Sequence, residues 1–234
     1  MPPTVESVGS TRNMNPGLTT TATAEARNAV AKRSTQGLSS VVPRAGKPET
    51  RQGMNIELRT KHYLLHVMRQ SPDFVRKLDF VAVTEGRIVG NVVYLKSHIE
   101  ADDGNRYEVL SLGPLSVHPQ YQRQGIGRML IEHTGRLAAQ MGFRAILLCG
   151  DSDYYSRVGF IRAEKFGIRT AENTYFDALH IRELTDESSE GLQGRYIENA
   201  IYGISAAEAA EYDKLFPPKR ILVGTPSQKN SKKS

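Results

Sequence analysis

Residues 112–142 read LGPLSVHPQYQRQGIGRMLIEHTGRLAAQMG. The stretch runs from an apolar strand through a polar loop with two glycines, one residue apart, into apolar residues at helical spacing. Glycines let backbone N–H groups come close to a ligand, and the positive end of a helix dipole lies at its N-terminus. The spacing Gln122-x-x-Gly125-x-Gly127 therefore predicts a site for a phosphate-bearing cofactor.

Neither of the commoner phosphate-binding loops has this spacing. A Walker loop needs Gly-Lys followed by Ser or Thr, and a dinucleotide fold needs Gly-x-Gly-x-x-Gly with an acidic residue about 20 positions on. Here Arg123 and Arg128 surround a single glycine pair. The preceding strand contains Gly113-Pro114. Because proline cannot donate to a sheet ladder, we expect this strand to splay from one neighbour and to leave backbone groups free for an extended ligand.

A second motif lies farther along the chain, at Tyr155-Ser-Arg-Val-Gly159-Phe160. With both motifs the chain resembles the GNAT superfamily of acetyl-CoA-dependent N-acetyltransferases, and within it a branch of predicted acetyltransferases of unassigned substrate. The resemblance covers roughly residues 56–218. It implies an α/β (α+β) fold in which helices flank a mixed, mostly antiparallel sheet with a central splayed strand pair.

Apolar spacing and turn residues predict the elements. Members of the superfamily usually open with a strand and a helix before the first hairpin, whereas here only one helix precedes it and we expect no strand in residues 1–52. The expected helices are 57–70, 125–141, 154–158 and 206–216, and the expected strands are 80–83, 88–95, 107–117, 145–149, 176–184 and 196–204.

The resemblance implies acetyl-CoA as cosubstrate and no metal. Backbone N–H groups of the splayed strand would meet the acetyl carbonyl, and those of the glycine loop would meet the pyrophosphate. The expected cofactor-binding residues are Leu115, Ser116, Val117, Gln122, Arg123, Gln124, Gly125, Ile126, Gly127 and Arg128.

Transfer of an acetyl group to an amine needs a proton donor for the departing thiolate. Tyr155 is the candidate general acid, because a phenol with a pKa of about 10 is protonated at neutral pH. The alternative is that Tyr155 only packs, and Tyr154 is then the candidate acid. For the general base we select Glu108 at the start of the splayed strand, with a solvated strand-end charge as the structural alternative. Cys149 is expected to be small and buried rather than nucleophilic, since no basic residue adjoins it.

Composition fits one globular domain with tails. The chain has 234 residues, of which 39% are hydrophobic and 24% charged. Residues 1–52 are poor in large apolar side chains, which predicts a disordered extension. Residues 53–218 form the expected acetyltransferase domain, and residues 219–234 a basic disordered tail. The net charge of +6 belongs to the ends, because 53–218 contain 19 basic and 22 acidic residues.

This charge distribution argues against a nucleic-acid partner, since the domain lacks a surplus of basic residues. No run approaches 18 apolar residues, so we expect no membrane partner. The expected partner is a primary amine, on a small molecule or a peptide, and a homodimer is kept as an option. A single cysteine favours a reducing compartment, and we expect the cytoplasm. An organelle is the alternative if residues 1–52 are a transit peptide.

Three functions are therefore weighed. The first is direct transfer of acetyl from acetyl-CoA to the amine in a ternary complex. The second is a catalytically weak CoA-binding sensor, which loss of Tyr155 or of the glycines would favour, although both are present. The third is a nucleic-acid-associated protein that binds through its basic tails.

Overall fold

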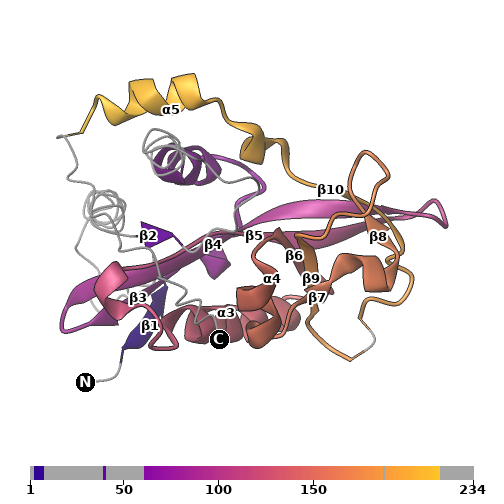
Figure 1. The fold of residues 1–234 in the computed structure, drawn as a ribbon, viewed down its shortest axis with the longest axis horizontal. Helices are drawn as coiled ribbons and strands as arrows, with labels where there is room; N and C mark the ends of the chain where they lie inside the picture. Colours follow the sequence, from indigo (N-terminus) through magenta and orange to yellow (C-terminus); the bar gives the residue numbers. More distant parts are fainter. Residues whose placement is uncertain (1–2, 8–38, 41–60, 187, 217–234) are drawn as a thin grey trace, which may run out of the picture.

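The computed structural model describes residues 3–7, 39–40, 61–186 and 188–216. The strands in this part of the chain form one sheet in the order β1-β3-β4-β5-β6-β9-β7, with β10 beside β4 and β8, and β2 beside β5 (Figure 1). β5 with β6 and β8 with β10 are parallel pairs, and the other described pairs are antiparallel. The predicted mixed, mostly antiparallel fold class is confirmed.

The elements have the following bounds. The strands are β1 Thr4–Ser7, β2 Ser39–Ser40, β3 Phe80–Thr84, β4 Arg87–Ala101, β5 Arg106–Val117, β6 Ala145–Cys149, β7 Ile161–Arg162, β8 Ile168–Arg169, β9 Leu179–Glu183 and β10 Gly194–Ile197. The helices are α3 Ile126–Gln140, α4 Ser152–Tyr155 and α5 Ala206–Asp213, with short 3-10 turns η1 Arg76–Leu78, η2 Pro119–Tyr121, η3 Ser156–Val158, η4 Ala163–Phe166 and η5 Ala200–Gly203. Residues 61–68 are also helical.

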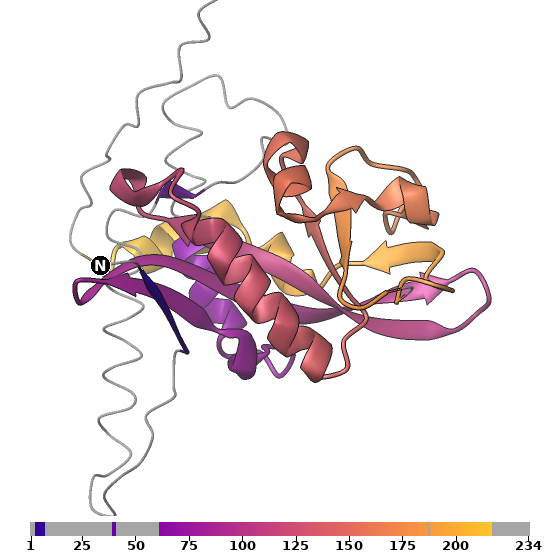
Figure 2. The same cartoon turned by 90° about the horizontal axis from the view of Figure 1, so that it is seen from below.

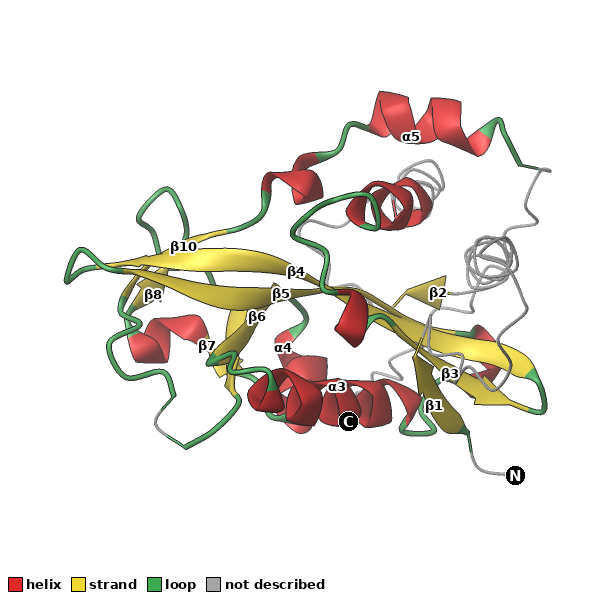
Figure 3. Cartoon of the chain, turned by 180° about the vertical axis from the view of Figure 1, so that it is seen from behind, coloured by secondary structure: helices red, strands yellow, loops and turns green. Residues whose placement is uncertain are grey.

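The long hairpin of β4 and β5 is the centre of the sheet (Figure 3). Its strands carry apolar side chains on both faces, so that most of their residues are buried. A sheet buried on both faces needs cover on both sides, and helices supply it here. The hairpin therefore separates two apolar cores.

On one face of the sheet the amphipathic helix α3 crosses the strands (Figure 2). Leu130 and Ile131 of α3 are fully buried against Val92 and Tyr94 of β4. The Tyr94 hydroxyl also bonds Thr134 Oγ1 at 2.6 Å, so the polar atom of this buried ring has a partner. The start of α3 is thereby held at a fixed place beside the sheet.

The other face is covered by the helix over residues 61–68 and by the segment that leads to α5 (Figure 1). Met68 is fully buried against Val93 and Leu95, which alternate along β4 with the residues that face α3. Ile201 and Tyr202 of η5 pack on the same cluster. This face is separated from α3 by the thickness of the sheet.

The expectation that no strand lies in residues 1–52 is wrong. Residues Thr4–Ser7 form β1, which pairs antiparallel with β3 at the edge of the sheet. Val5 packs, half-buried, against the core that α3 covers, whereas Thr4 and Glu6 are exposed. A four-residue strand is too short to give a reliable alternating pattern, which is why the sequence did not reveal it. Of the other residues in 1–52, the structure describes only Pro3 and the two residues of β2. The tail from 219 and the proposed domain boundary at 53 also lie outside the described residues.

The C-terminal half contains short elements that we did not predict. β7, η4 and β8 lie between residues 161 and 169, and β10 is four residues long where a strand over 196–204 was expected. No helix in the part of the chain that the structure describes is long and apolar enough to cross a bilayer. The expected helices 125–141 and 206–216 are present as α3 and α5, each slightly shorter.

Candidate functional site

The splayed strand has one open edge. Along its whole length β5 pairs on one side with β4, but on the other side β6 pairs only with Leu110 and Ser111. Gly113 has a φ of +143°, a conformation that side chains rarely adopt, and the β4 ladder shifts its register opposite it. From residue 112 onward β6 leaves the edge of β5. Only β2 pairs there among the residues described, with Ser39 opposite Val117 and Ser40 opposite Ser116.

The loop after β5 carries the chain from this edge to the start of α3. His118 caps η2 by accepting from the Gln120 N–H at 3.3 Å, and Gln122 Nε2 donates to the Val117 carbonyl at 3.1 Å. Gln124 Nε2 donates to the Gln120 carbonyl at 3.1 Å. The glutamine of the motif therefore holds the loop against the end of β5.

The N-terminus of α3 is open to an anion. Gly125 is its N-cap residue with a φ of +81°, and no side chain caps the first N–H groups. No acidic residue lies in the first turn, and Arg128 points its guanidinium to the Arg157 carbonyl at 2.7 Å. Uncapped N–H groups at the positive end of a helix dipole are a site for a phosphate or another anion.

The two motif glycines differ in their surroundings. A β-carbon on Gly125 would meet no heavy atom within 4 Å. A β-carbon on Gly127 would instead overlap with the hydroxyl of Tyr154, which lies against this point of α3. Gly125 is thus required by its backbone conformation, and Gly127 by the packing of Tyr154.

Tyr155 lies under the end of β6. Its ring is 3% exposed, and a β-carbon on Gly150 would overlap with it. Burial raises the pKa of this phenol well above its ordinary value, with smaller contributions from Tyr154, Tyr94 and Asp151. Tyr155 is therefore protonated at neutral pH and able to donate a proton.

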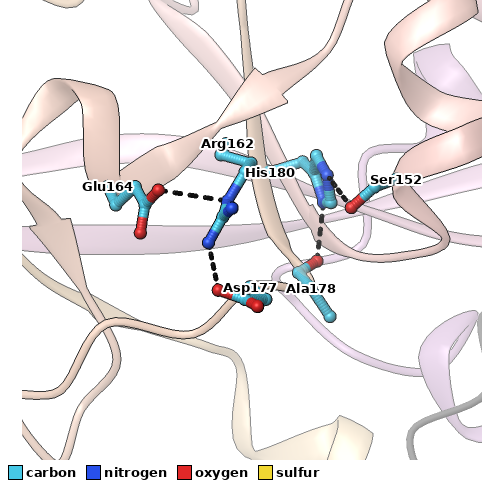
Figure 4. Close-up of polar contacts among 6 residues, drawn as sticks. All are labelled: Ser152, Arg162, Glu164, Asp177, Ala178 and His180. Carbon is cyan, nitrogen blue, oxygen red and sulfur yellow. Dashed lines mark hydrogen bonds and ion pairs between the residues drawn. The ribbon is translucent and has the colours of Figure 1, made fainter.

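A polar network holds α4, which carries both tyrosines. The Asp151 side chain caps α4 by accepting from the Asp153 N–H at 2.9 Å. Figure 4 shows the buried ring of His180 between Ser152 and Ala178. The Nδ1–H donates to the Ala178 carbonyl at 2.7 Å, so in this tautomer Nε2 accepts from the Ser152 hydroxyl at 3.0 Å. The first turn of α4 is thereby tied to β9.

A loop next to this network is fixed by ion pairs. Arg162 of β7 bonds Glu164 at 3.2 Å and also Asp177 (Figure 4). These side chains are partly exposed, so their contribution to stability is small. These ion pairs fix the position of the loop that leads back to β9 and His180.

A family model described as an acetyltransferase (GNAT) domain matches residues 77–162, which include β3 to β6, α3 and α4. The uncharacterized N-acetyltransferase YhbS of Escherichia coli strain K12 is 27% identical over 132 residues, which are 56% of this chain and 76% of YhbS. Residues 77–162 are therefore similar to the acetyltransferase domain of GNAT proteins.

Solved structures share the fold of this chain. The crystal structure of Escherichia coli YhbS in complex with CoA has a TM-score of 0.56 at 23% identity, covering 71% of this chain and 93% of that one. A GNAT acetyltransferase from Brucella melitensis in complex with acetyl-CoA has a TM-score of 0.53 at 22% identity, covering 75% and 94%.

The structure brings most of the predicted site residues together. Leu115, Ser116 and Val117 lie on the open edge of β5, and residues 122–128 continue from it into α3. Tyr155 joins them through Tyr154, whose ring it contacts edge-on at 5.0 Å between centroids. Their roles in binding and catalysis remain predictions.

Glu108 is not part of this group. It lies five residues before Gly113, roughly 17 Å away along the strand at about 3.4 Å per residue. Its carboxylate pairs with Lys96 at 3.0 Å and lines an open depression of about 470 Å³ with Met141 and Phe143, at the C-terminal end of α3. The structure therefore places Glu108 at the opposite end of α3 from Gly125 and gives no support for its role as base.

Cys149 was expected to be buried, and this expectation is wrong. It is exposed at the end of β6, where β5 and β6 diverge. Protein nevertheless surrounds the thiol, which raises its pKa to about 12, with a smaller contribution from the carboxylate of Glu198. The thiol is protonated at neutral pH, so it is a poor nucleophile.

Proposed function

We propose that this protein transfers an acetyl group from acetyl-CoA to a primary amine, which attacks the thioester directly in a ternary complex. The single observation that carries the proposal is the open edge of β5 that continues into the uncapped N-terminus of α3. An extended arm with amide groups fits the edge as an added strand would, and a pyrophosphate fits the helix end. The CoA and acetyl-CoA complexes of its structural relatives support this choice of cosubstrate.

In this proposal the arm of the cofactor lies along Leu115, Ser116 and Val117, and the pyrophosphate meets N–H groups of residues 123–128. The acetyl carbonyl then lies near Gly113, where backbone donors of β5 stabilise the oxyanion that forms on attack. The neutral amine attacks the carbonyl carbon, the C–S bond breaks, and the thiolate takes a proton from Tyr155. Tyr155 regains a proton from the nitrogen of the product.

Release of free CoA from acetyl-CoA tests the proposal. Purified protein is incubated with acetyl-CoA and a panel of amines that contains spermidine, a lysine-containing peptide and a dipeptide with a free N-terminus. We expect CoA release that depends on one class of amine, together with an acetylated product 42 mass units heavier, the mass that any acetyl group adds. Tight binding of acetyl-CoA without transfer to any of them would instead favour a CoA-binding sensor.

A further inference from the structure

The segment from Tyr196 to Tyr202 is fastened over the point at which β5 and β6 diverge. The Tyr196 hydroxyl bonds Ser111 Oγ, and the Tyr202 hydroxyl donates to the Gly113 carbonyl at 3.1 Å and to the Ser111 carbonyl at 3.4 Å. Ser111 is the last residue of β5 that pairs with β6. Two hydroxyls from one short segment thus reach the strand at the splay itself.

Asn199 fixes the middle of the same segment. Its N–H donates to Ser97 Oγ at 3.1 Å, and its side-chain amide donates to Asp73 at 2.8 Å and to the Lys96 carbonyl at 3.0 Å. These bonds tie the backbone next to Glu198 to β4 and to the turn before η1. The position of Glu198 is therefore determined by its neighbours on both sides.

The carboxylate of Glu198 does not help to hold the fold together. It makes no hydrogen bond or ion pair with the residues that the structure describes, and it is exposed. Burial raises the pKa of Cys149, Tyr196 and Tyr202 and the charge of Glu198 raises it further, so its carboxylate lies close to these three side chains. The Tyr196 hydroxyl in turn reaches Ser111. Cys149, at the end of β6, is exposed next to Glu198. The carboxylate thus faces the splay from the side opposite α3.

We propose that Glu198 binds the ammonium group of the acceptor and takes its proton, so that the acceptor is a cationic alkyl amine. This inference rests on the proposed function and concerns the binding of the acceptor amine. The amine enters from the face of the sheet that η5 and α5 cover, opposite the face of α3 and α4 (Figure 1). Acceptor and cofactor therefore approach the splay from different sides.

The proton balance of this step is complete. An ammonium group delivers one proton to the Glu198 carboxylate, which passes it to solvent, and the neutral nitrogen forms the new C–N bond. A second proton leaves the nitrogen as the C–S bond breaks, and it replaces the one that Tyr155 has given to the thiolate. The products are the acetylated amine, CoA as its thiol and one free proton.

The surroundings of Glu198 suit a base. Although the residue as a whole is exposed, the surrounding protein partly desolvates its carboxyl and raises its pKa above the ordinary value of a glutamate, so its basicity is greater than that of a solvated carboxylate. The titratable groups that face it are Cys149 from β6, Tyr196 from β10 and Tyr202 from η5, all held protonated at neutral pH by burial. No cation among these neighbours competes with the ammonium group.

The test compares Glu198→Gln with the wild type and with Glu211→Gln, which removes an exposed carboxylate of α5 that pairs with Lys214. Acetyl-CoA binding by calorimetry and kcat/KM for the amine found by screening are measured on all three. We expect Glu198→Gln to lose about 10²-fold in kcat/KM, a common contribution of a general base, and to bind acetyl-CoA within twofold of wild type. Glu211→Gln should match wild type in both.

An acceptor that needs no deprotonation separates a base from a structural role. Aniline is neutral at pH 7, so its acetylation should lose much less on Glu198→Gln than that of the alkyl amine. The base acts when unprotonated, so the acidic limb of kcat/KM in the wild type should fall at the raised pKa of Glu198 and be absent in Glu198→Gln. Equal kcat/KM of wild type and variant would overturn the role of Glu198 alone. Absence of transfer by the wild type would instead overturn the proposed function.

Discussion

The hydroxyl of Tyr154 lies against the α-carbon of Gly127, in the space that a β-carbon would occupy. Tyr154 belongs to α4 and Gly127 to the first turn of α3, so this contact joins the candidate proton donor's helix to the candidate phosphate site. Burial raises the pKa of the Tyr154 phenol, and the nearby charge of Arg128 opposes this in part. The glycine therefore has a packing role in addition to any approach of a cofactor.

Gly127→Ala should destabilise the protein by about 1–3 kcal/mol, the usual cost of overpacking. Adding Tyr154→Phe should restore most of this loss, because the ring carbon Cζ would lie 3.5 Å from the new methyl group, an ordinary contact. Urea unfolding of both single variants and the double variant measures the coupling. Additive effects would show that the two residues do not interact as described.

Gly135→Ala is the matched control in the same helix. A β-carbon there would meet its nearest atom, on Leu184, at 3.7 Å, so no neighbour must move. Alanine favours a helix interior by up to about 1 kcal/mol over glycine, and Gly135→Ala should therefore be neutral or stabilising.

Tyr155→Phe should lower turnover by about 10²-fold if the phenol protonates the leaving thiolate. Affinity for acetyl-CoA should change little, because one oxygen is lost and the phosphate contacts lie elsewhere.

A general acid loses activity as pH rises through its pKa, and burial holds the pKa of Tyr155 above the ordinary value of 10. Hence no alkaline loss due to Tyr155 should occur between pH 7 and about 9. Turnover is followed at saturating acetyl-CoA, with Tyr154→Phe as the neighbouring control. If Tyr155→Phe turned over as fast as wild type with chemistry limiting, Tyr155 would have no part in the reaction.

Val5→Asp should lower the free energy of unfolding by about 1–2 kcal/mol, since Val5 is the side chain through which β1 packs on the core. Glu6→Lys on the same strand is exposed and should change it by less than about 0.5 kcal/mol. Thermal or urea unfolding of both variants measures the difference. Equal stability of the two would mean that β1 does not pack on β3 in solution.

Ser39→Pro with Ser40→Pro should raise the apparent affinity for acetyl-CoA several-fold. Both β2 and the proposed cofactor arm use the edge of β5 at Ser116 and Val117, so they exclude each other. Proline removes the N–H donors of β2 and weakens this competitor, which enlarges the fraction of protein that is able to bind. Calorimetric titration with acetyl-CoA gives the dissociation constants of the wild type and of the variant. An unchanged or weaker affinity in the variant would argue against competition at this edge.

The sequence predicted those parts of the site that have a local pattern. The alternation and proline of β5, the glycines of the loop and the periodicity of α3 each lie within one short stretch, and the structure places them side by side. β1 was missed because four residues show too little alternation. Glu108 was selected because it lies where β5 begins, whereas β6 leaves the edge of β5 only after Ser111.

Residues of the acceptor side could not be found in this way. Glu198 follows a four-residue strand and has no motif around it, and it reaches the splay only because Tyr196, Asn199 and Tyr202 fasten its segment to β4 and β5. The role of Tyr154 depends on a contact between α4 and α3, 27 residues apart by their numbers. Such long-range contacts are fixed by tertiary packing rather than by local propensity.

Thermal unfolding with and without acetyl-CoA tests the central claim, that the edge of β5 and the start of α3 bind this cosubstrate. At a concentration of about 100 times its dissociation constant, acetyl-CoA should add about 2.7 kcal/mol to the stability of the wild type, and ATP or NAD should add nothing comparable. Gly125→Val should still fold, with lower stability, because its β-carbon meets no protein atom although the φ of +81° strains a branched residue. It should lose the stabilisation by acetyl-CoA, since the side chain stands where the pyrophosphate must approach. Stabilisation by ATP but not by acetyl-CoA, or an equal acetyl-CoA effect in Gly125→Val, would contradict the account.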